Sequence, residues 1–380
     1  MISPEGKVRL CSSSTEAMGD LREESLRSIW REGGVAEVRK KMAAGEWPHA
    51  CRGCRRNEEQ GLPSKRQKFY RKQKELHGEA ACLQALGQEV PEIRHLDLSF
   101  SNICNLSCVT CSGSYSTGWF HHQRQAVAEG LNYQGPLEGM ELRKLPQERI
   151  DEILKDHLSS LQTIVIKGGE PLADPQCVEF LAKVAASEHR RADLSLFIQT
   201  NGTLMKPETA AILGRLNASV GFSMDGVGDV FRWTRGGDFE AVLKNLYFLG
   251  RTPGIDRIFL DYTVSVYNVF HLAAFARFAL DLRAKSDLRL KCTFMGWANQ
   301  DHLSPRILPR EQRERALEEL LHVVAESPDF FEGVDVLEKV LKGPRLSEAS
   351  MEKFMKWKDF CNRMRGFRIE TLCPELLILK

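Results

Sequence analysis

The sequence predicts an α/β protein: an open, partial (β/α)6 TIM-like barrel, preceded by a cysteine-rich module and followed by helices. Three observations lead to this fold class. Short β-rich runs alternate with amphipathic helical patterns in the middle of the chain, which is typical of βα units that feed a parallel sheet. Closely spaced cysteines occur before this alternation and at its start. The last stretch of the chain shows helical periodicity only.

The chain is expected to form three parts: a cysteine-rich module at 1–90, the partial barrel at 91–300 and a C-terminal helical extension at 301–380. In the first part, helical spacing of apolar residues predicts a helix near 26–42, which Gly33-Gly34 should break. The expected barrel strands are 93–100, 163–166, 194–199, 219–223, 258–264 and 288–294. The expected helices between them are 147–157, 177–187, 207–216, 239–249 and 269–282. Six such units cannot close an eight-fold barrel, so the active face should lie at the carboxyl ends of an open sheet.

Bulk composition fits a globular enzyme and argues against several other classes of protein. Hydrophobic residues make up 42% and charged residues 27% of the chain, and the formal net charge is +2. A charge so near zero gives no strong global field for nucleic acid or for a membrane surface. The sequence shows neither an apolar run of about 20 residues nor a signal-peptide pattern. We therefore expect a cytoplasmic protein. Its eleven cysteines are too few for a disulfide scaffold and odd in number, so the clustered ones are expected to bind metal.

Cys104, Cys108 and Cys111 follow the first predicted barrel strand on one short loop. Thiolates are the usual ligands of iron–sulfur clusters, and a four-iron cube held by only three of them keeps one iron open to another donor. The spacing C-x3-C-x2-C resembles the signature of the radical S-adenosylmethionine (SAM) superfamily. The alternatives are three unrelated cysteines, or a zinc site completed by a distant residue.

Gly168, Gly169 and Glu170 follow the second predicted strand. At this place superfamily members carry a GGE motif that contacts the methionine amino group of SAM, and the resemblance implies the same role for these residues. The chemistry is suitable, because two glycines let the backbone approach a ligand while carbonyls and a carboxylate accept from an ammonium group. Taken alone, the tripeptide is an ordinary turn.

Three further turns resemble segments of the superfamily. Thr200 and Asn201 match its "TNG" ending after the third strand and are expected near the nucleoside or the substrate. Ser223 and Asp225 match its "S-x-D-G" segment, which implies that Ser223 reaches the ribose or carboxylate of SAM and that Asp225 faces the substrate. Asn268 matches a "V-x-x-N" pattern but is also a plausible helix cap. Asn-Gly and Asp-Gly are equally common in plain turns.

The resemblance implies a mechanism. A partner such as flavodoxin or ferredoxin would reduce a four-iron cluster. An electron from this cluster would then cleave SAM to methionine and a 5'-deoxyadenosyl radical. That radical abstracts a hydrogen atom from the substrate. Because the cofactors carry the difficult chemistry, the sequence identifies no separate catalytic side chain.

A second set of cysteines, Cys11, Cys51 and Cys54, precedes the barrel. Together with the residues around it, the set resembles the SPASM and twitch modules of this superfamily, which hold auxiliary iron–sulfur clusters and usually follow the barrel. Here the module stands in front, which implies a subgroup with this order. A closed site needs four ligands, so the fourth donor is expected to be Cys82, Cys361, a cysteine upstream of the printed start, a substrate group or nothing. Zinc in place of a cluster remains an alternative, since C-x2-C serves both.

Several remaining features are assigned structural roles. Cys177 and Cys292 lie in apolar patterns and should be buried, and Cys373 should pack near the terminus. The basic stretch 64–74 is expected to be a solvated helix face, although it could bind RNA.

The sequence leaves three function classes open. The favoured one is hydrogen abstraction from a peptide, by analogy with peptide-maturing relatives that carry auxiliary clusters. The second is the same chemistry on a small molecule or nucleotide. The third is a non-catalytic iron–sulfur or zinc scaffold or electron carrier.

Overall fold

The computed structural model describes all residues except 15, 62, 87–90, 136, 138, 139, 298, 299, 379 and 380. The chain forms two compact units. The first comprises 1–101, 143–166 and 186–194, and the second comprises 102–142, 167–185 and 195–380. The expected end of the cysteine-rich module at residue 90 lies outside the described residues, and the three-part division along the sequence stays a prediction.

The first unit combines short helices with two pairs of strands. Its elements are β1 (Lys7–Val8), β2 (Gly19–Asp20), α1 (Leu26–Arg31), α2 (Gly34–Ala43), α3 (Arg52–Glu59), α4 (Lys65–His77), α5 (Glu79–Leu86), β3 (His95–Leu98), α7 (Gln147–His157) and β4 (Thr163–Ile166). β1 and β2 are antiparallel, whereas β3 and β4 are parallel. The predicted helix near 26–42 is interrupted at Gly33 as expected, since α1 ends at Arg31 and α2 begins at Gly34.

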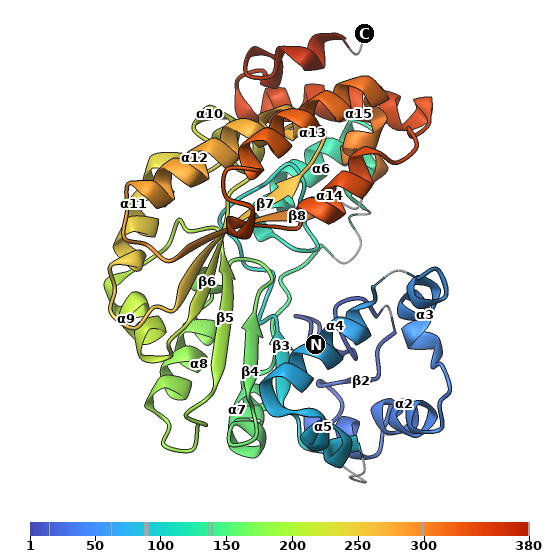
Figure 1. The fold of residues 1–380 in the computed structure, drawn as a ribbon, viewed down its shortest axis with the longest axis vertical. Helices are drawn as coiled ribbons and strands as arrows, with labels where there is room; N and C mark the ends of the chain where they lie inside the picture. Colours follow the sequence, from blue (N-terminus) through green and yellow to red (C-terminus); the bar gives the residue numbers. More distant parts are fainter. Residues whose placement is uncertain are drawn as a thin grey trace. The chain divides into compact units, whose positions relative to one another are not determined.

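The second unit contains the rest of the parallel strands and most of the long helices (Figure 1). Its strands are β5 (Ser195–Thr200), β6 (Ser219–Ser223), β7 (Arg257–Val264), β8 (Leu290–Trp297) and β9 (Phe331–Glu332). Its helices are α6 (Phe120–Ala128), α8 (Pro175–Ala186), α9 (Pro207–Arg215), α10 (Asp229–Arg235), α11 (Phe239–Gly250), α12 (Leu272–Ala284), α13 (Arg310–Val324), α14 (Val334–Leu341) and α15 (Glu348–Arg365). β5 to β9 pair in parallel, each with the next along the chain.

The α/β prediction is confirmed, and all six expected strands are present. Two of them, β4 and β6, have the predicted bounds, and the others shift by one to three residues at their ends. One parallel strand was missed: β9 has two residues, pairs with Cys292 and Thr293 of β8, and is too short to show periodicity in the sequence. The helices expected at 147–157, 207–216 and 239–249 correspond to α7, α9 and α11.

The core of the second unit lies between its strands and the helices that cover them. α9, α11 and α12 run along one outer side of β5 to β8 (Figure 1). Each contributes a fully buried apolar residue, Leu213, Leu246 and Phe275. Burying one such side chain stabilises the fold by about 1.5–3 kcal/mol, so these contacts hold the strands firmly under the loops at their carboxyl ends.

The opposite face of the same strands is polar toward their carboxyl ends, beyond the Phe197–Phe259 ring contact. Gln199 on β5, Ser223 on β6, Asp261 and Thr263 on β7, and Thr293 on β8 alternate with the apolar residues that face the helices. Because successive residues of a strand point to opposite faces, this pattern places hydrogen-bonding groups on the inner face of the half-barrel. A closed barrel would fill that space with branched apolar side chains.

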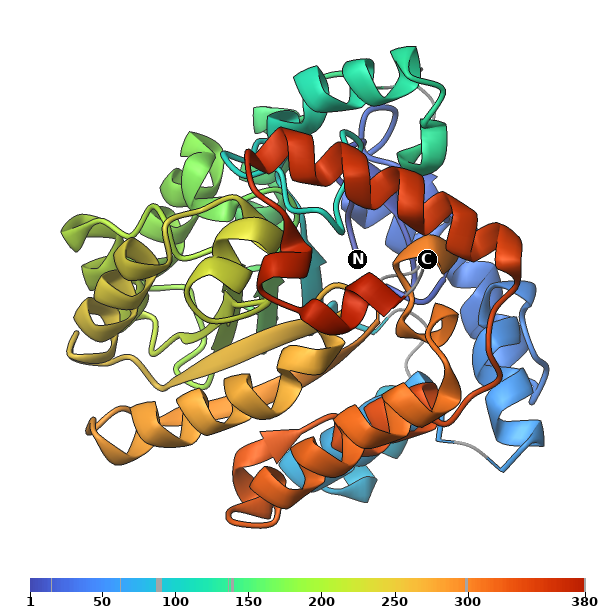
Figure 2. The ribbon, with the colours of Figure 1, turned by 90° about the horizontal axis from the view of Figure 1, so that it is seen from above.

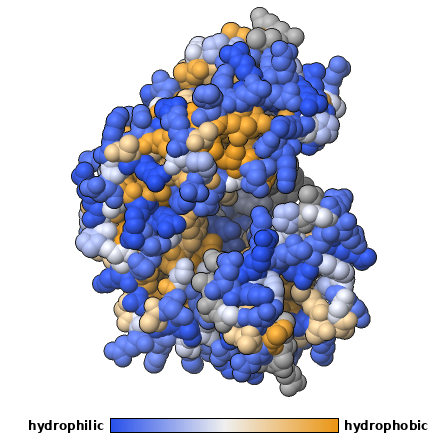
Figure 3. Space-filling view, viewed as in Figure 1, coloured by the Kyte–Doolittle hydropathy of each residue, from blue (hydrophilic) through white to orange (hydrophobic). Residues whose placement is uncertain are grey.

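The C-terminal helices expose charged faces. Ion pairs four residues apart join Arg310 to Glu314 and Arg315 to Glu319 on α13. Hydrophilic side chains cover most of the face seen in Figure 3, with apolar side chains visible between them. Among the described residues, no helix has the length and apolar character needed to cross a membrane. All eleven cysteines are free thiols.

Candidate functional site

Cys104, Cys108 and Cys111 line one cavity of about 360 Å³ in the second unit. The cavity lies at the carboxyl ends of β5 to β7, where the partial barrel was expected to have its active face. Of the other predicted site residues, three also line it: Gly169, Asn201 and Ser223. Arg235 and Thr263, which the sequence did not indicate, line it as well.

Side chains that follow the cysteine loop in the chain form hydrogen bonds with its backbone. The Cys104 N–H donates to Thr117 Oγ1 at 3.1 Å, and that hydroxyl donates to the Cys104 carbonyl at 3.1 Å. Ser116 Oγ donates to the Leu106 carbonyl at 2.6 Å, and Trp119 Nε1 donates to the Cys108 carbonyl at 2.8 Å. These bonds fix the loop backbone at Cys104, Leu106 and Cys108, and the three thiols line the cavity.

Burial raises the pKa of all three thiols, because a thiolate loses hydration inside the protein. The Arg235 guanidinium opposes this rise in each case. Each thiol would therefore ionise when a cationic centre binds among them.

The thiols do not surround a single ion. The described ranges contain no group of three histidine, cysteine or acidic side chains arranged to hold one metal ion. An iron–sulfur cube makes a different demand, since each thiolate binds a separate iron atom at a separate corner. Three thiols that line a cavity of this size, one buried and two partly buried, fit such a cube better than they fit a lone zinc ion.

Glu170 acts as a clamp between loops. Its carboxylate accepts hydrogen bonds from Thr200 Oγ1 at 2.6 Å, the Asn201 N–H at 2.6 Å and the Leu172 N–H at 3.1 Å. Its own N–H donates to the Ile103 carbonyl at 2.7 Å, which ties this turn to the start of the cysteine loop. These bonds use most of the carboxylate's acceptor capacity. Burial nevertheless raises the pKa of Glu170.

Gly168 and Gly169 adopt φ values of +89° and +49°, conformations that L-amino acids with a side chain rarely take. The sharp turn brings backbone, rather than a side chain, to the cavity at Gly169. The Glu170 carboxylate is largely engaged within the protein, and the expected contact of this turn with an ammonium group stays a prediction.

The two "TNG" residues have different roles. Thr200 is buried and is committed to Glu170, whereas Asn201 lines the cavity. Asn201 Nδ2 donates to Asn105 Oδ1 at 2.9 Å and lies 3.9 Å from Cys104 Sγ. A polar N–H next to a ligand sulfur stabilises negative charge on that sulfur.

Asp225 and Arg235 form a buried ion pair at 2.7 Å. The second oxygen of Asp225 accepts from the Thr263 N–H at 2.8 Å, so both carboxylate oxygens accept hydrogen bonds from within the protein. Arg235 keeps Nε without a hydrogen-bond partner and lines the cavity beside the cysteines. Sequence reasoning had no means to find Arg235, because a single arginine at the end of a helix carries no periodic or spacing signal.

Asn268 lies behind these groups as a structural link. It is buried, and its Nδ2 donates to the carbonyls of Asp225 at 3.1 Å and Thr263 at 3.0 Å. Its Oδ1 accepts from the Ser265 N–H at 2.7 Å. Asn268 occupies the N-cap position of the short 3-10 turn Val269–His271, as the helix-cap alternative expected. Its side chain, however, makes no capping hydrogen bond to that turn.

The second cysteine set lies in the first unit. Cys51 ends the 3-10 turn His49–Cys51 and Cys54 lies in α3. Burial raises the pKa of the Cys51 thiol, and the neighbouring thiols Cys54 and Cys11 raise it further. Cys11 and Cys54 thus lie within electrostatic range of Cys51, and their expected role as cluster ligands stays a prediction.

A cationic and an aromatic side chain lie beside Cys51. Arg66 opposes the rise in the Cys51 pKa, and its guanidinium stacks 4.9 Å from the Trp47 ring centroid. Both residues line a hollow of about 180 Å³ together with Cys51. Of the two cysteines named as possible fourth donors, Cys361 is fully buried in α15 and Cys82 is partly exposed on α5.

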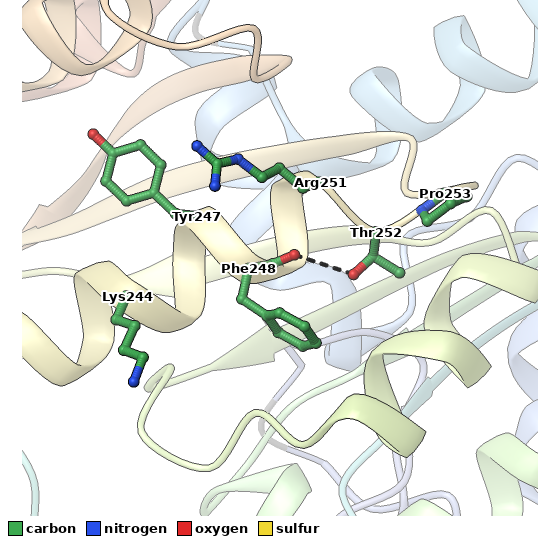
Figure 4. A pocket seen from close by; sticks show the side chains of 6 residues that line it. All are labelled: Lys244, Tyr247, Phe248, Arg251, Thr252 and Pro253. Carbon is green, nitrogen blue, oxygen red and sulfur yellow. Dashed lines mark hydrogen bonds between the residues drawn. The ribbon is translucent and has the colours of Figure 1, made fainter.

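A larger hollow of about 580 Å³ lies at the end of α11 and is a poor candidate for a catalytic site. Figure 4 shows its lining side chains diverging: Lys244 and Phe248 extend to one side of the helix, and Tyr247 and Arg251 to the other. Thr252 Oγ1 donates to the Phe248 carbonyl at 3.2 Å, which closes the helix end locally. The hollow has no thiol in its lining and no convergent polar groups.

Two family models match the chain. Residues 98–259 match the radical SAM superfamily, and residues 1–55 match the SPASM iron–sulfur cluster-binding domain. The first range contains all three cavity cysteines, and the second contains Cys11, Cys51 and Cys54. Residues 98–259 form a radical SAM segment, and residues 1–55 form a SPASM segment. The SPASM segment precedes the radical SAM segment, as the resemblance implied, and the cofactors of this family are a 4Fe-4S cluster, SAM and an auxiliary iron–sulfur cluster.

Curated relatives share less than half of this radical SAM chain. An uncharacterised protein of Methanocaldococcus jannaschii is 26% identical over 164 residues, covering 42% of this chain and 50% of the relative. The GTP 3',8-cyclase of Geobacter sulfurreducens is 31% identical over 157 residues, covering 40% of this chain and 41% of the relative. The chain therefore spans about half the length, or less, of these relatives.

Solved structures show distant similarity. Native anSMEcpe with bound AdoMet is 19% identical with a TM-score of 0.42, and the match covers 67% of this chain and 63% of that one. Streptococcus suis SuiB bound to the precursor peptide SuiA is 16% identical with a TM-score of 0.39, covering 81% of this chain and 64% of that one.

Proposed function

We propose that this radical SAM protein is an enzyme in which Cys104, Cys108 and Cys111 hold the SAM-binding 4Fe-4S cluster. The observation that carries the proposal is the shared cavity: three thiols from one loop, one buried and two partly buried, line it, and no described carboxylate or imidazole takes a fourth ligand position. When bound, the cofactors would supply reductive cleavage of SAM and a carbon radical able to abstract hydrogen from a substrate.

The chain's own residues would bind and orient the cofactor. The backbone at Gly169 offers acceptors for an ammonium group, and Glu170 fixes that backbone against the Asn201 turn. Arg235 offers a buried positive charge for the SAM carboxylate, and Ser223 offers a hydroxyl at the same cavity. In this assignment Asp225 orients Arg235 and does not itself face a substrate.

The auxiliary cluster is proposed to bind Cys11, Cys51 and Cys54. The SPASM match over residues 1–55 and the electrostatic proximity of the three thiols support this assignment. The fourth donor remains one of the possibilities named above.

The proposed substrate is a peptide, since the chain carries an auxiliary-cluster module of the kind common in peptide-modifying members of the family. A small molecule or nucleotide is the alternative; the curated relative from Geobacter sulfurreducens is a GTP 3',8-cyclase. We propose a flavodoxin or ferredoxin as the reductant and a cytoplasmic location, where reduced thiols and oxygen-sensitive clusters persist.

Anaerobic reconstitution tests the proposal. Wild-type protein should bind about eight irons per chain and release 5'-deoxyadenosine when SAM and dithionite are added. The Cys108→Ala variant should lose about four irons per chain and should release no 5'-deoxyadenosine. The Cys51→Ala variant should also lose about four irons but should still release 5'-deoxyadenosine.

Cys292→Ala is the matched control, because Cys292 is fully buried in β8 and belongs to neither set. It should change neither quantity. The assignment of the cluster ligands would be overturned if the Cys292 variant lost 5'-deoxyadenosine release while the Cys108 variant kept its full iron count.

A further inference from the structure

The C-terminal end of α15 reaches the cysteine loop through Arg365. Arg365 Nη2 donates to the Ser107 carbonyl at 2.6 Å, and Nη1 donates to Ser107 Oγ at 3.1 Å. The third nitrogen, Nε, donates to the Trp233 carbonyl of α10 at 2.7 Å. Ser107 immediately precedes Cys108, so the planar guanidinium grips the loop between two proposed cluster ligands with a fixed, two-pronged geometry.

The space for this guanidinium is built into the backbone. Gly236 has φ +76°, and a Cβ there would lie 2.5 Å from Arg365 Nη1. No other residue type fits this position without displacing the arginine. The close approach indicates that the contact is a specific feature of the fold, since a surface arginine would have room to move.

A second contact from α15 meets the loop on the other side of Cys108. Trp357 Nε1 donates to the Val109 carbonyl at 3.5 Å, and the Trp357 ring stacks on Trp119 at 5.6 Å. Trp119 in turn donates to the Cys108 carbonyl. Figure 2 shows α15, in red, running beside the teal α6, and Trp119, which links α15 to the loop, immediately precedes α6.

Arg365 also brings charge to the site. Its guanidinium contacts Ser107, the residue before Cys108, so a positive charge lies next to a proposed cluster ligand. Positive charge and hydrogen-bond donors near a cluster favour the reduced, more negative state and so raise its reduction potential. Arg235 provides a similar charge from α10, but it lines the cavity itself.

We propose that Arg365 is a positioning residue that holds the cysteine loop and raises the reduction potential of the SAM-binding cluster, so that the C-terminal helix tunes a cofactor bound at the start of the barrel. The proposal rests on the proposed function, because it requires a cluster on Cys104, Cys108 and Cys111. It assigns to the C-terminal extension a role beyond packing.

The test uses the full chain, reconstituted without oxygen, with Arg365→Gln and Arg365→Lys compared to wild type. Electron paramagnetic resonance (EPR) during a redox titration measures the midpoint potential, and the change in the spectrum on adding SAM identifies the SAM-binding cluster. Arg365→Gln should shift this midpoint to a more negative value and lower the intensity of the SAM-sensitive signal severalfold. Arg365→Lys, which keeps the charge but loses the fork, should restore the midpoint without restoring the full intensity.

Arg363→Gln is the control on the same helix. Its side chain is 59% exposed and pairs with Glu129 at the surface, so both the midpoint and the intensity should match wild type. An Arg365→Gln protein with the wild-type midpoint and intensity would overturn the proposal.

Misfolding and failure of the proposed function give different results. Ser107→Ala removes only the Ser107 Oγ acceptor and should give a smaller loss of intensity in a folded protein; no loss at all would contradict the clamp. A wild-type protein without any SAM-sensitive cluster signal would instead reject the proposed function itself.

Discussion

Replacing Glu370 with glutamine should strongly destabilise the second unit, and the structure sets the size of the effect. Glu370 forms a buried ion pair with Lys358 at 2.7 Å, in which the two side chains are 2% and 4% exposed. The carboxylate also accepts from Asn362 Nδ2 at 2.9 Å and from Arg368 at 3.0 Å. Asn362 in turn accepts from Trp233 Nε1, so the network joins α15 to α10 beside the cysteine loop.

Two independent estimates agree. Removing one partner of a buried pair leaves an uncompensated charge, here on Lys358, and costs about 3–5 kcal/mol. Burial opposes ionisation of Glu370, but the donors Lys358, Arg368 and Asn362 outweigh it and lower the pKa from 4.5 to about 2. That shift corresponds to about 3 kcal/mol of stability. We expect Glu370→Gln to lower the free energy of unfolding by about 3 kcal/mol at pH 7.

The effect has a defined pH window. A carboxylate with a lowered pKa in the folded state stabilises the protein fully above its unfolded pKa, and this stability is lost as the pH falls toward the folded pKa. The gap between wild type and Glu370→Gln should therefore be constant from pH 7 to about 5 and shrink below about 4.5.

Urea denaturation of both proteins at each pH measures this gap. Arg368→Ala is the matched control, because Arg368 pairs with the same carboxylate but is 64% exposed, and it should cost less than about 1 kcal/mol. Equal losses from the Arg368 and Glu370 variants, or a gap that grows on acidification, would refute the reasoning.

Three further predictions concern buried groups of the second unit. Burial raises the pKa of Asp261 from 3.8 to about 6, so its ionisation destabilises the fold as the pH rises; Asp261→Asn should stabilise the protein by about 1–3 kcal/mol at pH 7.5 and give no gain near pH 4 in the same denaturation assay. Asn268→Ala leaves buried backbone groups without partners and should cost about 2–3 kcal/mol, whereas lost SAM binding at unchanged stability would indicate direct contact with the cofactor. Cys361→Ala should cost about 1 kcal/mol through a small cavity and leave the iron count unchanged; a loss of about four irons would make Cys361 the auxiliary ligand after all.

Local sequence patterns were sufficient for much of the fold. A strand of alternating residues and a helix of 3.6-residue period each leave a signal within a window of about ten residues, and so β4 and β6 could be predicted to the residue. The two-residue strand β9 left no such signal, since its pairing with β8 depends on residues far away in the chain.

The same distinction applies to the site. The spacing of Cys104, Cys108 and Cys111 was visible because chelation by one loop is a local property, and the two-segment family match agrees with it. The partners of Glu170 and Asp225 within the protein were not visible: the first carboxylate accepts from Thr200 and Asn201, and the second pairs with Arg235. The expected ligand contacts of both residues stay predictions. Which partner a buried carboxylate meets depends on how separate loops are brought together.

By itself, the sequence determined the class of fold, the strands with clear periodicity and the two cysteine sets. Only the tertiary structure placed Arg235 in the cavity and brought Arg365 to Ser107 across 258 positions of the chain. The physical reason is that spacing encodes contacts between near neighbours. Contacts between distant segments form only when the core packs and decides which side chains meet.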